Sequence, residues 1–497
     1  MCKVSFTPMT ATMLFRIYTR SYRQTQQRRW PFWLWAVILW LLGACSRPVM
    51  PDKAVQFANK AFGERRDQIA CQQLKKIDSH NIASWPRTTA WAWLRLSALC
   101  AVRKGETSAG DLQRLPVPFG TYAVAMFHFY RHETQQAARL LEAIATSHFS
   151  DREPSYRLGL IWLLDEQFEK AFPYFESALQ DPVVPQATVR LAIARTLLGL
   201  GRLDEITSTL SPLLSYASPS QLAVAKRLVE TSLAFRRRIP PDLVPQLEKV
   251  RTLLQVEEPI GALDELEKVL PQYAHSALLH YMRGVIHLRL GNTSDAVVEL
   301  NESLKIEPHD PEAHMLLGHI YFHAQRDTEA RHHLEAAIAA NPFLAAAWAR
   351  LRDVYTRNEA FRHAVDAHKT FMKLSEKPDT TELLTTLAHL QEKAGHLEEA
   401  VAIHERLVRR QGDEDAFSSL VALARLYLAL STDLNRALEY RRKAATFVRR
   451  AEKIRATDVE LAKIKERLGM NTQKTKFEKQ LRTRGGKPIV NDTNLLE

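Results

Sequence analysis

The residues from Ala277 to Pro342 read ALLHYMRGVIHLRLGNTSDAVVELNESLKIEPHD and then PEAHMLLGHIYFHAQRDTEARHHLEAAIAANP, which are two copies of one pattern. Gly284, Ala296 and Pro308 in the first copy are each followed, 34 residues later, by the same residue type. Self-similarity at a fixed period of this length is the signature of a repeat protein. This stretch therefore decides how the rest of the chain is interpreted.

Each copy predicts a pair of helices. With Ala277 as position 1, positions 4, 7, 8 and 11 share one face of a first helix, and positions 20, 24 and 27 share one face of a second. Small residues stand at positions 8 and 20, where the two helices must approach most closely. Gly291 suits the left-handed turn between the helices, and Pro308 ends the second one.

These residues resemble the tetratricopeptide repeat, a 34-residue helix-turn-helix family. Weaker copies of the pattern occupy residues 159–182, 194–213, 348–364, 384–407 and 420–437. The third copy departs from the pattern, because Arg352 replaces the small residue at position 8 and His368 the apolar residue at position 24. The resemblance implies an all-α fold, a right-handed superhelical solenoid of such repeats.

The amino terminus predicts export. A basic segment ends at Arg29, and an apolar run from Trp30 to Leu42 follows. As a helix this run would span roughly 20 Å, too little for a hydrocarbon core of about 30 Å. A secretory signal therefore fits better than a transmembrane helix.

Leu42-Gly43-Ala44-Cys45 resembles the lipobox of bacterial lipoproteins. The resemblance implies that Cys45 is the lipid attachment site and the first residue of the mature chain. Because Ser46 and not an aspartate follows, the resemblance further implies an outer-membrane lipoprotein facing the periplasm, with inner-membrane anchoring as the alternative. An uncleaved signal anchor is the other interpretation of this segment.

We expect five segments. They are a lipoprotein signal peptide (1–44), a lipidated amino terminus with irregular helices (45–118), degenerate helical repeats (119–239), a tetratricopeptide array (240–448), and a charged helix with a disordered basic tail (449–497). The boundary before residue 240 rests on Pro240 and Pro241, which a continuous helix cannot contain. In the last segment, residues 452–468 predict one amphipathic helix.

The net charge of +12 is unevenly distributed. Residues 1–44 contain six basic and no acidic residues, and residues 436–497 contain 17 basic and eight acidic ones. The remainder is slightly acidic, so we expect no nucleic-acid-binding face.

Two cysteines, Cys71 and Cys100, remain in the segment expected to be exported. They could form a disulfide bond, which would stabilise the fold by roughly 3 to 4 kcal/mol. Two buried thiols on facing helices are the favoured alternative.

The repeat register also predicts a binding surface. In the resembled family, positions 2, 5, 9, 12 and 13 of each first helix face a concave groove that commonly holds extended peptides. Aromatic residues and methionine ringed by charges suit such a groove. In this sequence the candidate residues are Tyr281, Arg289, Met315, His319, Phe322, His323, Asp353, Arg357, His389, Glu392 and Lys393.

We expect neither a metal nor another cofactor, and no enzymatic activity. His319 and His323 have the four-residue spacing of a metal-binding pair, but nothing nearby completes a site. The sequence contains no nucleotide fingerprint and no nucleophile elbow. A small-molecule substrate is not expected.

The two resemblances together imply a lipid-anchored scaffold that binds other proteins of the bacterial cell envelope. Such a scaffold could serve the assembly or secretion of an envelope complex, a pilus, or polysaccharide or peptidoglycan machinery. Alternatives are a signal-anchored regulatory adaptor and, less favoured, a glycan- or peptidoglycan-acting enzyme with its site before Pro240.

Overall fold

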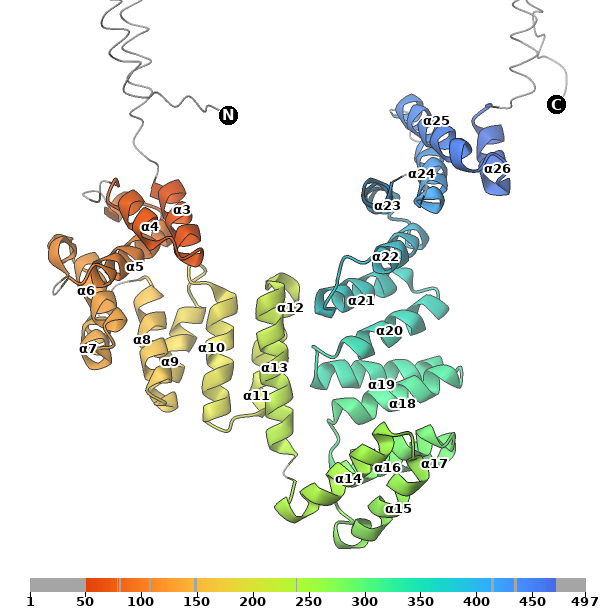
Figure 1. Cartoon of the computed structure of the whole chain (residues 1–497), viewed down its shortest axis with the longest axis horizontal. Helices are drawn as coiled ribbons and strands as arrows, with labels where there is room; N and C mark the ends of the chain where they lie inside the picture. Colours follow the sequence, from red (N-terminus) through yellow and green to blue (C-terminus); the bar gives the residue numbers. More distant parts are fainter. Residues whose placement is uncertain are drawn as a thin grey trace, which may run out of the picture. The chain divides into compact units, whose positions relative to one another are not determined.

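The computed structural model describes residues 51–470, apart from residues 78, 80–81, 107–108, 147–149, 238, 413–414 and 433–435. Every regular element in these residues is a helix (Figure 1). The chain divides between Leu158 and Gly159 into two compact units.

The first unit contains five helices and two short 3₁₀ turns within the described residues. The helices are α3 (Pro51–Gly63), α4 (Asp67–Leu74), α5 (Arg87–Arg103), α6 (Phe119–Tyr130) and α7 (Thr134–Ala145), and the turns are η1 (Ile82–Ser84) and η2 (Gly110–Arg114). Trp91, Tyr122 and Phe127 fill its core.

Cys71 on α4 and Cys100 on α5 are joined by a disulfide bond, with their Cα atoms 5.7 Å apart. The favoured expectation of two free thiols is therefore wrong. Periodicity along each helix indicates which face is buried, but it does not place one cysteine opposite another on a neighbouring helix.

The second unit begins with helices of less regular length. They are α8 (Glu153–Leu164), which starts in the first unit, α9 (Phe168–Leu179), α10 (Gln186–Gly199), α11 (Asp204–Leu210), α12 (Leu213–Tyr216) and α13 (Pro219–Arg236). Ser218 starts α13 with a reciprocal capping box to Gln221. The helix ends just ahead of Pro240 and Pro241.

Six helix pairs follow, and we call them the repeat array (Figure 1). They are α14 (Val244–Gln255) with α15 (Pro259–Val269), α16 (Ala277–Arg289) with α17 (Thr293–Ile306), α18 (Pro311–His323) with α19 (Asp327–Ala340), α20 (Ala345–Arg357) with α21 (Phe361–Leu374), α22 (Thr381–Lys393) with α23 (Leu397–Gln411), and α24 (Phe417–Leu430) with α25 (Ala437–Ile454). Two 3₁₀ turns, η3 (Pro241–Leu243) and η4 (Leu270–Gln272), flank the first pair, and α26 (Val459–Arg467) ends the described chain.

The helix expected over residues 452–468 is interrupted. Helix α25 continues to Ile454, and α26 starts afresh after Asp458, whose carboxylate accepts a hydrogen bond from the Leu461 amide at 2.9 Å. Asp458 is a good N-cap, so the sequence favours a new helix start over continuation there.

The close approach within each hairpin involves position 8, as the register predicts, but the nearest atoms belong to position 24 and those of position 20 lie farther away. A Cβ atom on Gly284 would lie 2.8 Å from Cγ of Leu300, and one on Gly318 would lie 2.6 Å from Cγ of Leu334. Position 8 therefore packs directly against position 24. The predicted fold class, an all-α solenoid of tetratricopeptide-type hairpins, is confirmed.

Helices upstream of the array also touch it. The Arg237 guanidinium, at the end of α13, pairs with Asp310 at 2.7 Å and with Glu312 at 3.0 Å. Farther along, the Lys373 ammonium donates to the backbone oxygen of Leu214 at 3.0 Å. Residues before and after Pro240 thus belong to one unit.

Candidate functional site

The predicted groove residues lie on the first helices of four consecutive pairs, α16, α18, α20 and α22. Five of them are exposed, namely Arg289, His323, Arg357, His389 and Lys393, and six are half-buried, namely Tyr281, Met315, His319, Phe322, Asp353 and Glu392. The structure shows which of these side chains already have partners inside the chain.

The two arginines at position 13 bridge neighbouring repeats. Arg289 donates to the backbone oxygen of Leu254 at 3.0 Å, and Arg357 donates to that of Phe322 at 2.9 Å. Both acceptors lie near the carboxyl end of the preceding first helix, where carbonyls lack helical partners and attract positive charge. These arginines therefore hold successive repeats in register.

The apolar anchors are partly used for packing. Met315 and Phe322 pack against the core cluster built around Leu334 and Leu351, and the Arg357 guanidinium lies 3.7 Å above the Phe322 ring. Shortening either anchor would therefore disturb the contact between two repeats. Neither side chain is a free ligand-binding group.

Tyr281 and Glu392 are engaged as well. The Arg237 guanidinium lies 5.8 Å from the Tyr281 ring, and burial, reinforced by Glu312, raises the pKa of this tyrosine. Glu392 accepts from Arg425 of the next repeat at 2.7 Å.

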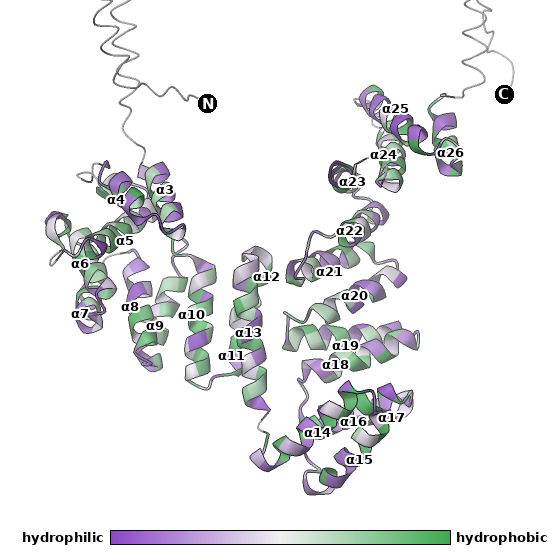
Figure 2. Cartoon of the chain, viewed as in Figure 1, coloured by the Kyte–Doolittle hydropathy of each residue, from purple (hydrophilic) through white to green (hydrophobic). Residues whose placement is uncertain are grey.

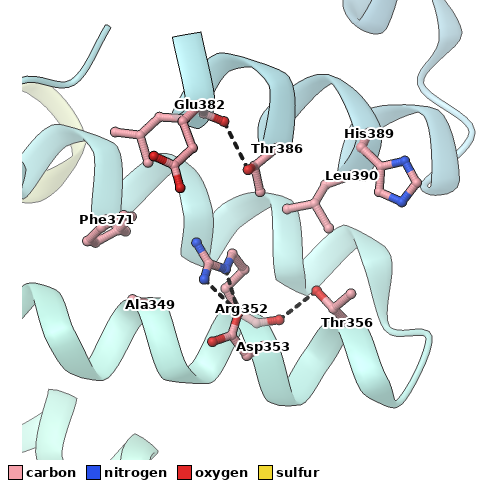
Figure 3. Close-up of a pocket in the computed structure, with 10 residues that line it drawn as sticks. Ala349, Arg352, Asp353, Thr356, Phe371, Glu382, Thr386, His389 and Leu390 are labelled. Atoms are coloured by element: carbon pink, nitrogen blue, oxygen red, sulfur yellow. Dashed lines mark hydrogen bonds and ion pairs between the residues drawn. The ribbon is translucent and has the colours of Figure 1, made fainter. Parts of the chain in front are cut away.

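A pocket of about 460 Å³ opens between α20, α21 and α22 (Figure 3). It contains two of the predicted residues, Asp353 and His389. The other lining residues are Ala349, Arg352, Thr356, Phe371, Glu382, Leu383, Thr386 and Leu390. Of these, Ala349, Thr356 and Glu382 occupy positions 5, 12 and 2 of the register, so the sequence could have identified them.

The two departures from the repeat pattern, Arg352 and His368, contact each other beside this pocket. Arg352 donates from Nε and Nη2 to Oδ1 of Asp353, at 2.8 and 2.6 Å, and from Nη1 to Nδ1 of His368 at 3.3 Å. His368 is fully buried and donates from Nε2 to the backbone oxygen of Leu383 at 2.9 Å. Because Nδ1 accepts and Nε2 donates, the ring is neutral, and burial followed by the nearby Arg352 charge lowers its pKa.

Two further changes create the space. Position 5 holds Tyr281 and Met315 in the preceding repeats but Ala349 here, and position 27 holds Ser303 and Ala337 before Phe371. The short Ala349 side chain opens a hollow, and the Phe371 ring forms part of its wall. The pocket therefore lies where this repeat differs in sequence from its two predecessors.

The pocket offers both apolar and hydrogen-bonding surface. Its lining includes one guanidinium, two carboxylates and two hydroxyl groups beside alanine, leucine and phenylalanine side chains (Figure 3). These groups suit the recognition of a side chain and an adjoining peptide backbone.

The histidines of the array make recurring structural contacts. At position 4, His280 donates to the backbone oxygen of Ala274 at 3.1 Å, His314 to that of Pro308 at 3.0 Å, and the Trp348 indole to that of Pro342 at 2.8 Å. Histidine and tryptophan at position 4 thus form the same hydrogen bond, to the backbone oxygen six residues earlier. The His319 and His323 rings meet edge to face at 4.4 Å, and no group of three metal-ligand side chains occurs in the described residues.

Two carboxylates before Pro240 are held in ion pairs. Asp151 pairs with Arg87 at 2.5 Å, and the buried Glu153 pairs with Arg95 at 2.5 Å and with Arg157 at 2.9 Å. These contacts give both acids a structural role.

The predicted lipid attachment site, Cys45, lies outside the described residues. Within those residues, no helix combines the length and apolar character needed to cross a membrane.

Residues 287–354 match the family model described as the tetratricopeptide repeat. This part of the array is therefore similar to tetratricopeptide repeats. The match begins at the end of α16, includes α17, α18 and α19, and ends within α20. It therefore covers most of the two regular repeats and most of the first helix beside the pocket. No curated protein matches the chain in sequence.

Several solved structures are similar to part of this chain. A crystal structure of MamA is 22% identical, covering 33% of this chain and 94% of its own, with a TM-score of 0.30. YrrB, described as a TPR protein with an unusual peptide-binding site, is 16% identical, covering 40% and 97% with a TM-score of 0.33. PilF of Pseudomonas aeruginosa is 17% identical, covering 45% and 96% with a TM-score of 0.31.

Proposed function

We propose that this protein is a non-enzymatic scaffold that holds an extended segment of a partner protein, with the pocket between α20 and α22 as the specificity-determining contact. The observation that carries the proposal is that this repeat departs from its two predecessors at positions 5, 8, 24 and 27 together. Ala349, Arg352 and Phe371 line one pocket, and His368 accepts a hydrogen bond from Arg352.

Substitutions that only had to preserve packing would have kept the glycine–leucine pair of the preceding repeats. Arg352 instead brings a half-buried charge into the groove, with 20% of its side chain exposed, and two partners are needed to satisfy it. Burying part of this charge costs stability, and a role in recognition would explain why the arrangement is present.

The first experiment is peptide selection. A phage-displayed library of random 12-residue peptides would be panned on the full chain carrying Cys45→Ser, and selected peptides measured by fluorescence anisotropy. The variant Ala349→Met restores the bulky side chain of the preceding repeat and fills the pocket. The matched control is Ala402→Met, at an exposed alanine of the second helix α23, outside the groove positions.

We expect the selected peptides to bind the control variant normally and Ala349→Met at least about ten-fold more weakly, since one well-filled pocket contributes more than about 1.4 kcal/mol. Equal binding to both variants would show that the pocket is not the site. Failure to enrich any peptide would count against peptide binding itself.

We further propose that the scaffold is exported, lipidated at Cys45 and attached to the outer membrane facing the periplasm, where it serves an envelope complex. The sequence around Cys45 supports this location. The Cys71–Cys100 disulfide supports it too, because such bonds persist mainly in oxidising compartments.

The mass of the mature amino terminus, measured in a lipoprotein-processing host, tests the location. A terminus that begins with acylated Cys45 and is lost in Cys45→Ser is the expected result. An intact amino terminus in both forms would instead support the signal-anchored adaptor.

A further inference from the structure

Helix α25 has two chemically distinct faces. Tyr440, Ala444, Val448 and Ala451 form a buried stripe packed against α24. On the opposite side, Arg442, Arg449 and Lys453 are exposed and follow the i, i+7, i+11 spacing of a single face. We call these three residues the basic face of α25. Figure 2 shows this helix as largely hydrophilic with a hydrophobic side.

Four of the five acidic residues in this part of the chain are engaged elsewhere, and the fifth, Glu466, is exposed on α26. Residues 436–470 contain eleven basic and five acidic residues. Lys443 binds Glu439 at 2.7 Å, Lys465 binds Glu452 at 2.5 Å, and Arg425 binds Glu460 at 2.6 Å. Asp458 caps α26.

This use of the acids leaves the basic face without a carboxylate partner among the residues that the structure describes. Lys463 and Arg467 on α26 are further exposed cations. The imbalance is therefore a local property of the last helices and not of the array as a whole.

A solvated cap at the end of the array does not explain this face. A terminal repeat needs a polar outer surface, and interspersed charges of both signs provide one. Arg449 and Lys453 are four residues apart, so their charges repel along the helix. Repulsion between these positive charges destabilises the folded state, and binding to an anionic partner would offset that repulsion.

We propose that the basic face of α25 docks on the anionic phospholipid headgroups of the membrane to which the chain is attached. The choice of a lipid surface rests on the proposed membrane location of this protein. Because the apolar stripe of α25 is buried, the contact is electrostatic and does not involve insertion into the bilayer. Arginine and lysine near a charged membrane surface each strengthen binding roughly five-fold, and the effect is screened by salt.

The test uses residues 45–497, the mature chain expected after cleavage, with Cys45→Ser. Neither the lipid nor the apolar run at residues 30–42 then contributes to binding, and the outcome is independent of peptide binding. Sedimentation with vesicles of phosphatidylglycerol and phosphatidylcholine would be compared with pure phosphatidylcholine vesicles, at about 0.05 M and at 1 M salt. The variant R442Q/R449Q/K453Q removes the basic face. The control R251Q/K268Q/K305Q removes three exposed cations of the array that pair with nearby glutamates.

We expect binding to the anionic vesicles alone, its loss at 1 M salt, and a roughly 100-fold weaker affinity for the first variant but not for the control. Unchanged thermal unfolding would show that both variants fold. Three results would each overturn the proposal. They are equal binding by the two variants, equal binding to neutral vesicles, and tighter binding to duplex DNA than to anionic vesicles at the same salt concentration.

Discussion

The Arg352 guanidinium occupies a place that a glycine holds in both preceding repeats. It fits because His368 replaces the leucine that would have collided with it and offers a ring nitrogen at 3.3 Å. The two substitutions are therefore a coupled pair, and neither is understood alone. Sequence comparison of the repeats identified both residues as departures without indicating that they touch.

Arg352→Gly should destabilise the protein by about 2 to 4 kcal/mol. About 1 kcal/mol comes from glycine in a helix and the rest from a buried ring nitrogen that has lost its donor. Adding His368→Leu recreates the pair found at Gly318 and Leu334. Most of the stability lost with the hydrogen bond to the histidine ring should then be recovered. Urea unfolding of both variants measures this coupling, and strictly additive costs would contradict it.

His404 is the second histidine at position 24. It is buried, and burial together with the Arg425 charge lowers its pKa to about 4. The unfolded value is about 6.5, so the folded state prefers the neutral ring. Its contribution to stability is present above about pH 6.5 and is lost as the pH falls toward 4.

His404→Leu should therefore flatten the acid limb of the stability profile between pH 6.5 and 4, by up to about 3 kcal/mol. Urea midpoints measured at half-unit pH intervals would show it. His275→Leu, at an exposed histidine just before α16, is the matched control. An unaltered acid limb in His404→Leu would mean that other groups cause the acid sensitivity.

At the scale of helices, the hairpin is held by the contact between positions 8 and 24. The absence of a side chain at Gly318 lets Leu334 lie against the backbone of α18. Successive hairpins are then joined by the arginines at position 13. The first contact lies within one repeat and the second between two repeats.

Gly318→Ala should cost about 1 to 3 kcal/mol, because its new methyl group would overlap Leu334. Leu334→Ala alone should cost about 2 to 5 kcal/mol by leaving a cavity. The double variant should cost clearly less than the sum, since each change relieves the other. A double-mutant cycle from chemical unfolding provides the measurement, and an additive result would argue against the register.

On the scale of the whole molecule, the disulfide bond belongs to the first unit only. Cys71 and Cys100 lie 29 residues apart, and the link restricts the unfolded first unit. Arg237, Asp310 and Glu312 instead connect the helices before and after Pro240 within the second unit. The two units thus have different sources of stability.

The variant C71S/C100S should lower the unfolding free energy of the first unit by about 3 kcal/mol and leave the second unit's transition in place. Calorimetry of the native chain and of the variant, each in oxidising and in reducing buffer, would distinguish the unfolding transitions of the two units. The variant should be insensitive to the reductant. A shift of both transitions together would show that the units unfold as one.

The sequence by itself determined the repeat, its register and the all-α fold. Helical periodicity placed Gly284, Leu300, Gly318 and Leu334 on the helix faces that meet within one repeat, and the structure showed that positions 8 and 24 are in direct contact. The same register identified the helix face that carries Asp353 and His389.

Only the tertiary structure decided which groove residues are free. Arg289, Arg357, Met315 and Phe322 form contacts between repeats, and the pocket opens where Ala349 and Arg352 of one repeat face residues of the next. The disulfide bond was likewise settled by the packing of α4 on α5. Contacts between neighbouring repeats and helices depend on how they stack in three dimensions, and no period along the chain encodes that arrangement.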